Sequence, residues 1–448
     1  MSNAISKYLH ERIPRYTSYP TAPHFSAGVG PLTYRHWLQV LPRSATLSLY
    51  LHVPFCETLC WYCGCHTNVS RHRDPVERYV ALLRWEIAMV AELVGGRRVS
   101  HVHWGGGTPG IVGPDLFRSV MDALRGHFDF VPDAERAVEI DPRRLTPALA
   151  DAFAETGINR ASLGVQTFNP LSQQAIARVQ SPEMTRDCVR TLRAAGIRDI
   201  NLDLLYGLPH ETAQSCSAGV ETALALEPAR FSVFGYAHVP SVMPHQRVID
   251  MASLPDGPER LRQERTIGEA CVRAGYTRIG LDHYARPEDS MAVALAEGRL
   301  RRNFQGYTTD SADALIGFGA SAISRLPDGY AQNTANLRDW SDRIKAGTPA
   351  TVRGVALSDE DRLRAGIIER LMCDLRADIP AHLAEAGYPA DWLDPEIADL
   401  QPLADDGLVA IERGVIHVPE ASRSLIRKVA SIFDIYLDPA LGRHAVAV

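Results

Sequence analysis

Residues 56–65 read Cys-Glu-Thr-Leu-Cys-Trp-Tyr-Cys-Gly-Cys, and this stretch holds four of the eight cysteines of the chain. It directly follows residues 47–53, Leu-Ser-Leu-Tyr-Leu-His-Val, an apolar run that predicts a β-strand. Four thiols so close together at the end of a strand indicate a set of metal ligands.

The spacing of these cysteines, C-x3-C-x2-C-x-C, argues against the commoner metal sites. A structural zinc usually takes two ligand pairs separated by a dozen or more residues, and no second pair at suitable spacing follows. A ferredoxin-type run has different gaps. Three thiolates of one loop, Cys56, Cys60 and Cys63, can instead hold three irons of a [4Fe–4S] cube and leave the fourth iron open to a small molecule. Cys65 lies so close to Cys63 that we expect a thiol beside the cluster that is not a ligand.

Composition excludes several classes of protein. The chain has 448 residues, 46% of them hydrophobic and 22% charged, which is enough material for one large core and a smaller domain. A formal net charge of −6 without a basic block argues against a general nucleic-acid binder. The N-terminus has no apolar signal core, and no run reaches the roughly 18 apolar residues of a membrane span. We therefore expect a cytoplasmic protein that binds neither nucleic acid nor membrane.

Strand-like and helix-like segments alternate from residue 47 onward. Strands are expected at 48–53, 101–104, 137–140, 160–165, 200–205, 231–236 and 276–281, and helices at 75–94, 114–128, 147–155, 213–226 and 260–274. Such alternation predicts an α/β fold with parallel strands, closed into a partial or complete TIM-like (β/α) barrel. Chemistry in such barrels lies at the carboxyl ends of the strands.

Three parts of the chain are expected. Residues 1–45 form an N-terminal arm, predicted to be irregular because of its prolines. Residues 46–350 form the barrel with an extension. Residues 351–448 form a mainly helical, winged-helix-like C-terminal domain with a hairpin near 408–418 and a closing helix near 421–437.

A glycine-rich stretch at 104–110, Trp-Gly-Gly-Gly-Thr-Pro-Gly, follows the second predicted strand. It contains G-x-G-x-x-G, but proline interrupts the turn and no acidic residue follows at the distance typical of a dinucleotide site. A tight turn alone would explain the glycines. We favour a second role, because the three consecutive glycines, which include Gly106 and Gly107 and precede Thr108, leave a backbone without side chains that a ligand can approach closely.

Polar residues also follow the later strands. Glu139 and Asp141 share one face at the end of the third strand, by strand alternation. Gln166, Arg178 and Asp203 lie at or just beyond the next two strand ends. Each alone is more often structural, but their recurrence at successive strand ends predicts a binding site.

Aromatic and imidazole groups flank the cysteines. Tyr50, His52 and Tyr62 lie within a few residues of them, and His52 is expected to orient the metal site through hydrogen bonds.

The chain resembles a known enzyme family. C-x3-C-x2-C after residues 52–55, His-Val-Pro-Phe, is similar to the radical S-adenosylmethionine (SAM) enzymes. Cys65, residues 15–21 (Arg-Tyr-Thr-Ser-Tyr-Pro-Thr) and residues 301–309 narrow the resemblance to the oxygen-independent coproporphyrinogen III oxidases, or dehydrogenases. The likeness extends over almost the whole chain.

This resemblance implies the cofactors and their sites. One [4Fe–4S] cluster would be held by Cys56, Cys60 and Cys63, and the glycine-rich loop and Glu139 would receive SAM at the open iron. A second SAM molecule is implied near Ala237, Phe304, Gln305 and Ile323. The full set of cofactor-binding residues is Tyr50, Tyr62, Gly106, Gly107, Thr108, Glu139, Gln166, Arg178, Asp203, Ala237, Phe304, Gln305 and Ile323.

The resemblance also implies the reaction. Two propionate side chains of coproporphyrinogen III would be decarboxylated oxidatively to vinyl groups, giving protoporphyrinogen IX for anaerobic haem synthesis. The enzyme would act as a monomer with a donor such as flavodoxin or ferredoxin. The carboxylates of the substrate require cations, for which the candidates are Arg15, Arg286, Arg301 and Arg302.

Three alternatives remain open on the sequence. A haem-binding chaperone of the same family shares the three-cysteine motif, although it typically lacks Cys65 and the arm motif at 15–20. Another porphyrin-directed radical SAM enzyme would share the barrel. A zinc-stabilised protein without catalytic activity is the third.

Overall fold

The computed structural model describes residues 7–8 and 11–437, and a curved sheet of twelve strands dominates it. Seven neighbouring strands are parallel, in the order β13-β1-β4-β5-β6-β7-β8. Their bounds are β1 (Leu47–Val53), β4 (Arg98–Gly106), β5 (Asp129–Ile140), β6 (Arg160–Gln166), β7 (Asp199–Tyr206), β8 (Arg230–Gly235) and β13 (Ala314–Phe318).

Antiparallel strands extend both edges of this parallel block. β14 (Ile323–Leu326), β15 (Gly329–Asn333) and β16 (Thr351–Ala356) follow β13, and β10 (His283–Ala285) and β9 (Thr277–Ile279) follow β8. Within the described residues β16 and β9 do not pair with each other, so the barrel is partial. The strand expected at 276–281 is therefore not a parallel barrel strand. Three residues separate β9 from β10, and a connection that short joins only antiparallel strands.

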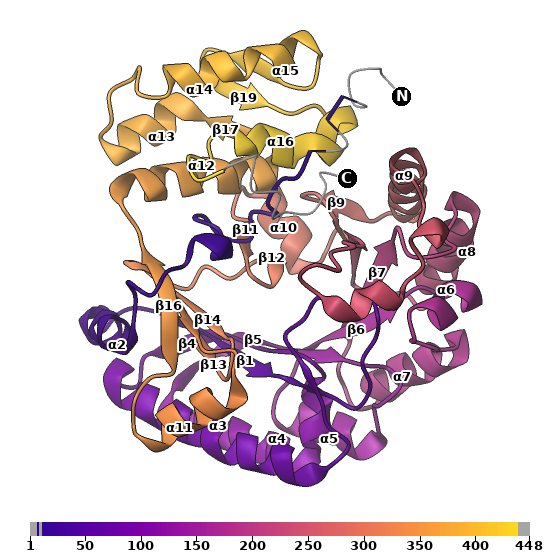
Figure 1. Cartoon of the computed structure of the whole chain (residues 1–448), viewed down its shortest axis with the longest axis vertical. Helices are drawn as coiled ribbons and strands as arrows, with labels where there is room; N and C mark the ends of the chain where they lie inside the picture. The colour runs from indigo at the N-terminus through magenta and orange to yellow at the C-terminus, as the bar shows by residue number, and fades with distance from the viewer. Residues whose placement is uncertain (1–6, 9–10, 438–448) are drawn as a thin grey trace.

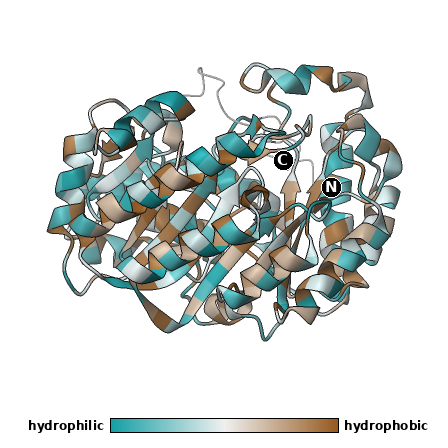
Figure 2. Ribbon diagram, turned by 90° about the horizontal axis from the view of Figure 1, so that it is seen from below, coloured by the Kyte–Doolittle hydropathy of each residue, from teal (hydrophilic) through white to brown (hydrophobic). Residues whose placement is uncertain are grey.

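Helices cover the outer face of the parallel strands (Figure 1). They are α3 (Arg73–Val94), α4 (Pro114–His127), α5 (Pro147–Glu155), α6 (Pro170–Ala175), α7 (Pro182–Ala194), α8 (Ala213–Leu224) and α9 (Gly257–Arg273). Brown and teal residues alternate along the covering helices in Figure 2, as expected when one face packs on a sheet and the other meets water. The main core lies between the two layers, around fully buried residues such as Trp104 and Phe117.

The segments after β10 and β15 carry smaller elements. α10 (Ser290–Ala296) precedes a hairpin of β11 (Arg301–Asn303) and β12 (Gly306–Thr308), and α11 (Leu337–Lys345) lies between β15 and β16. β16 carries the sheet past residue 350, the expected boundary, to Ala356.

The C-terminal part begins with α12 (Asp359–Asp374). A three-stranded antiparallel sheet, β17-β19-β18, packs with short helices into its own core. The remaining bounds are β17 (Arg376–Asp378), α13 (Ile379–Ala386), α14 (Asp394–Asp399), α15 (Gln401–Asp405), β18 (Ala410–Glu412), β19 (Val415–His417) and α16 (Ile426–Ser431). The single helix expected at 421–437 is wrong, because a 3₁₀ segment at Glu420–Leu425 precedes α16 and the chain turns after Ser431.

The N-terminal arm runs between the C-terminal helices and the sheet, as the indigo segment in Figure 1 shows. Ile13, Tyr16 and Tyr19 belong to the C-terminal core, and the Tyr16 hydroxyl donates to Asp434 Oδ2 over 3.0 Å. The arm is not irregular throughout, because α2 (Pro31–Val40) is a regular helix. Pro31 occupies its first turn, where a missing N–H costs nothing, so this proline starts a helix and does not break one.

Candidate active site

The cysteine loop leaves the carboxyl end of β1 and is fastened at both ends. β2 (Phe55–Cys56) pairs with β3 (Asn68–Val69), and the Ser70 amide donates to the Cys56 carbonyl over 2.8 Å. The loop is therefore held at the end of the barrel where the sequence predicts chemistry.

Each of the three predicted ligand sulfurs is close to a polar hydrogen. Cys56 Sγ accepts from Thr67 Oγ1 at 3.2 Å and lies 3.4 Å from Thr108 Oγ1. Cys60 Sγ accepts from Arg178 at 3.6 Å and Arg143 at 3.7 Å. Cys63 Sγ accepts from the backbone amide of Cys65 at 3.4 Å. Donors of this kind stabilise thiolate ligands, so the residues present fit an iron–sulfur cluster.

No three His, Cys, Asp or Glu side chains among the described residues gather closely enough for a single metal ion.

The predicted residues meet in one cavity of about 440 Å³, here called the cluster-side cavity. Residues from the cysteine loop and from the ends of β4, β5, β6 and β7 line it. Its predicted members are Cys56, Cys60, Tyr62, Cys63, Gly106, Gly107, Thr108, Glu139, Gln166, Arg178 and Asp203. Cavities of this size hold small organic ligands.

Glu139 is positioned by two donors. The Gly106 amide donates to its Oε2 at 3.3 Å, and His103 Nε2 lies 3.0 Å from its Oε1. His103 in turn stacks on Tyr50, with 5.9 Å between the ring centroids. The sequence reasoning missed His103, although strand alternation along β4 places it on the face of the sheet that Glu139 shares.

His52 links Tyr50 to the cysteine loop. Its Nε2 lies 3.0 Å from the His66 carbonyl, and its Nδ1 lies 2.9 Å from the Tyr50 hydroxyl. Burial lowers the pKa of His52 to about 4, so the ring is neutral at pH 7. A carbonyl only accepts, and therefore Nε2–H donates to His66 while Nδ1 accepts from Tyr50. The expectation that His52 orients the loop fits this geometry.

An acidic residue organises the two arginines beside Cys60. Asp141 is 2.6 Å from Arg143 Nη2 and 3.4 Å from Arg178 Nη2. Burial acts to raise the pKa of Asp141, but the two guanidinium groups hold it below its usual value. The negative charge of Asp141 therefore persists and keeps both arginines on the sulfur. Arg143 was not predicted, and its position two residues after a strand-end aspartate was the available signal.

Asp203 is the one predicted carboxyl group whose proton affinity is high. Burial and the nearby Glu139 raise its pKa to about 7, while Ser162 and Asn201 donate to it at 3.0 and 2.7 Å. Near neutral pH it can thus accept or donate a hydrogen bond to a bound hydroxyl group.

The residues implied for a second SAM molecule do not line the cluster-side cavity, although the cavity of Gln305 adjoins it. Gln305 lines a cavity of about 170 Å³ inside the barrel, together with Glu139 and Asp203. Phe304 lines a separate cavity of about 540 Å³, and Ala237 lines a third. Ile323 begins β14. A second SAM site remains a prediction.

Two of the four candidate arginines for the substrate line a pocket at the carboxyl end of β8, and two do not. Arg286 donates to the Pro228 carbonyl at the amino end of β8, opposite the cluster, and Arg301 is paired with Glu369 at 2.9 Å. Arg286 is thus wrongly placed for a substrate at the cluster. Arg15 and Arg302 line a pocket at the carboxyl end of β8.

Comparison with known proteins identifies the family. Residues 50–218 match the model of the radical SAM superfamily. An oxygen-independent coproporphyrinogen III oxidase of Bradyrhizobium diazoefficiens is 52% identical over 442 residues, which is 98% of this chain and 98% of that protein. The chain belongs to the oxygen-independent coproporphyrinogen III oxidase family. The Escherichia coli member is 40% identical over 436 residues, or 97% of this chain and 94% of that protein.

The solved structure of the coproporphyrinogen III oxidase HemN from Escherichia coli, a radical SAM enzyme, has the same fold. It superposes with a TM-score of 0.91 at 38% identity and covers 95% of this chain and 100% of that one. The predicted family and the predicted barrel are both confirmed. Membership of the superfamily makes an iron–sulfur cluster and SAM the cofactor types of this site.

Among the described residues, no helix is both long and apolar enough to cross a membrane.

Proposed function

We propose that this protein decarboxylates two propionate side chains of coproporphyrinogen III oxidatively to vinyl groups, giving protoporphyrinogen IX. The observation that carries the proposal is the set of strand-end residues around the cysteine loop, together with 52% identity to an oxidase of that name. In each of two rounds the substrate loses one hydrogen atom, one CO2 and one electron.

Cys56, Cys60 and Cys63 would hold a [4Fe–4S] cluster, and the rest of the cluster-side cavity would hold SAM. Once bound and reduced, this pair supplies the carbon radical that takes a hydrogen atom from the β-carbon of a propionate. The backbone at Gly106 and Gly107, which carries no side chain, and the carboxylate of Glu139 suit the amino and carboxylate end of SAM. Asp203 and Gln166 suit its ribose hydroxyl and adenine amino groups.

The contribution of the chain is orientation and exclusion of water. Reactive carbons must be held within van der Waals contact, and a primary radical attacks any group it meets. Glu139 cannot swing freely, because His103 and the Gly106 amide fix both of its oxygens. Arg178 is fixed by Asp141 and by the Gly164 carbonyl at 2.5 Å. Both groups are thus preorganised before a ligand binds.

We also propose a second SAM site, an electron donor and an oligomeric state. Ala237, Phe304, Gln305 and Ile323 contribute to a site for a second SAM molecule. The electron donor is a flavodoxin or a ferredoxin, and the protein acts as a cytoplasmic monomer.

The test incubates anaerobically reconstituted protein with SAM, dithionite and coproporphyrinogen III, and follows 5′-deoxyadenosine and protoporphyrinogen together. We expect both products. SAM cleavage without protoporphyrinogen would reject the substrate, and tight haem binding without SAM cleavage would favour a haem-binding chaperone.

A further inference from the structure

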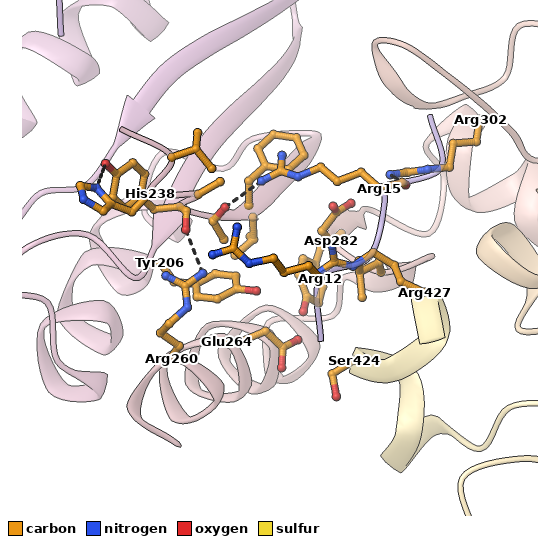
Figure 3. Close-up of a pocket in the computed structure, with 18 residues that line it drawn as sticks. Arg12, Arg15, Tyr206, His238, Arg260, Glu264, Asp282, Arg302, Ser424 and Arg427 are labelled. Carbon is orange, nitrogen blue, oxygen red and sulfur yellow. Dashed lines mark hydrogen bonds between the residues drawn. The ribbon is translucent and has the colours of Figure 1, made fainter. Parts of the chain in front are cut away.

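A second pocket lies beside the cluster-side cavity and is lined by five arginines. It has a volume of about 100 Å³, and Figure 3 shows Arg12 extending across it between Arg260 and Arg427. These arginines come from four parts of the chain: the N-terminal arm, α9, the β11 strand and α16. They are Arg12, Arg15, Arg260, Arg302 and Arg427, and we call this site the arginine pocket.

The positive charge of the arginine pocket exceeds the negative charge that faces it. Of the described lining residues, two are carboxylates, Glu264 and Asp282. Glu264 is ion-paired with Arg278, which does not line the pocket, and Asp282 lies 2.7 Å from His283 Nδ1. Glu264 is therefore engaged outside the pocket. Burial acts to raise the pKa of Asp282, but His283, Arg302 and Arg15 hold it below its usual value, so Asp282 is the one of these two carboxylates that acts on the pocket arginines.

The arginines are held in place mainly by neutral acceptors. Arg15 donates to the Gly235 carbonyl at 3.0 Å, Arg260 to the Tyr236 carbonyl at 2.9 Å and Arg427 to the Ile13 carbonyl at 3.2 Å. Arg302 donates to the carbonyls of residues 15 and 16 at 3.1 and 3.2 Å. Carbonyls orient the half-buried guanidinium groups of Arg260 and Arg302 without neutralising their charge, and charge held away from water is costly.

The hydrogen-bond donors of the pocket arginines are not all used. Arg302 Nη1 and Arg260 Nε are buried and have no hydrogen-bond partner within the described residues. Burial, together with the neighbouring Arg15 and Arg302, lowers the pKa of Arg427 to about 10. An anion in the pocket would offset the charge of the arginines that line it.

The size and place of the arginine pocket limit what that anion is. A volume of 100 Å³ is too small for a tetrapyrrole, since sites for whole organic ligands start near 300 Å³, but it accommodates a carboxylate on a short chain. Gln246 Nε2 donates to the Ala237 carbonyl in the wall and to the Tyr62 carbonyl in the cysteine loop, at 3.3 and 3.1 Å. The pocket thus lies directly beside the cluster loop.

We infer that the arginine pocket binds a propionate carboxylate of the substrate that is not reacting, and so anchors the macrocycle with another side chain toward the cluster-side cavity. This inference rests on the proposed function for the identity of the substrate. Arg15 and Arg302 were candidates from the sequence, whereas Arg12, Arg260 and Arg427 come from the structure. Guanidinium groups are suited to the site because their paired N–H groups match a carboxylate.

The test uses the reconstituted full chain and the variants R15Q and R12Q/R15Q. Arg12 and Arg15 are exposed on the arm, so these changes leave the core intact. Arg35→Gln is the matched control, because Arg35 also donates one bond from the N-terminal segment to a backbone carbonyl, that of Gly347, away from the pocket.

We expect the KM for coproporphyrinogen III to rise about tenfold in R15Q and more in the double variant, as for the loss of charge-assisted hydrogen bonds. The kcat, the KM for SAM and the cluster absorption should change by less than about twofold. An unchanged KM for coproporphyrinogen III would overturn the inference. An equal rise in the KM for SAM would assign the pocket to the carboxylate of SAM and would also overturn it.

A binding assay separates this inference from the proposed function. Binding of coproporphyrin III, the oxidised macrocycle that is not turned over, is compared with binding of its tetramethyl ester. Inorganic phosphate is added as a competitor. We expect R12Q/R15Q to weaken binding of the acid about tenfold or more and to leave the ester unaffected. Equal loss for acid and ester would refute the carboxylate site, even if the wild type showed full activity.

Discussion

Replacing Gly107 by alanine should push the glycine-rich loop away from the cysteine loop. The new Cβ would lie 2.5 Å from the Phe55 carbonyl oxygen and 2.6 Å from Thr67 Oγ1, whereas such contacts are essentially never shorter than 3.0 Å. The two backbones must therefore move apart by about 0.5 Å or more. They are joined here by bonds of 2.8 Å, from the Gly107 amide to the Val53 carbonyl and from the Thr108 amide to the Phe55 carbonyl.

This displacement acts on Cys56, the residue after Phe55, and on the wall of the cluster-side cavity where we propose that SAM binds. Overpacking of this kind costs about 1–3 kcal/mol of folding free energy. Misplacement by about 1 Å costs on the order of 100-fold in rate, so 0.5 Å should cost about tenfold. We expect kcat/KM for SAM cleavage to fall about tenfold, with the unfolding midpoint lowered.

The assay measures 5′-deoxyadenosine from SAM and dithionite, alongside iron content and thermal unfolding. Gly126→Ala in α4 is the control, because its Cβ meets no atom within 4 Å. That change should keep SAM cleavage and raise stability by about 0.4–1 kcal/mol. Wild-type SAM cleavage and stability in the Gly107 variant would refute the packing argument.

Three further predictions concern single side chains. Cys60→Ala should remove the brown cluster absorption and SAM cleavage together, whereas Cys188→Ala, in the core, should keep both; retained activity in the Cys60 variant would reject the ligand assignment. His103→Ala frees one oxygen of Glu139 and should raise the KM for SAM about tenfold at constant iron content, measured by initial rates; an unchanged KM would show that the Gly106 amide alone holds Glu139. Burial raises the pKa of Glu86 from 4.5 to about 7. Between these two pH values the folded protein keeps the Glu86 proton and the unfolded chain has lost it, so the free energy of unfolding falls as pH rises from 4.5 through 7. Urea titrations should show wild type losing roughly 3 kcal/mol relative to Glu86→Gln over that range, and parallel curves would contradict the assignment.

Local sequence was sufficient for the centre of the site. The cysteine loop and the residues at the ends of β4 to β7 are each next to a strand in sequence, and parallel strands bring their carboxyl ends to one rim. Spacing and alternation thus predicted Gly106, Glu139 and Asp203, which all line the cluster-side cavity.

Local sequence failed where contacts join distant segments. The arginine pocket combines Arg12, Arg260 and Arg427, which no periodicity relates. Arg286 was misassigned because a cation near a strand gives no sign of which strand end it occupies. Helices α2 and α7 are absent from the predicted series; for α2 the reason is that Pro31, which lies in its first turn, was read as a helix breaker.

The docking of the N-terminal arm on the C-terminal core has a consequence for synthesis. Tyr16 leaves the ribosome early, but its partner Asp434 follows 418 residues later. Domains commonly fold from the N-terminal side while synthesis proceeds, so the barrel can form before the arm has a surface on which to dock. Arg12 and Arg15 reach the arginine pocket only after Arg427 has been made. A chain truncated before Arg427 would therefore have its cysteine loop in place but could not complete the arginine pocket.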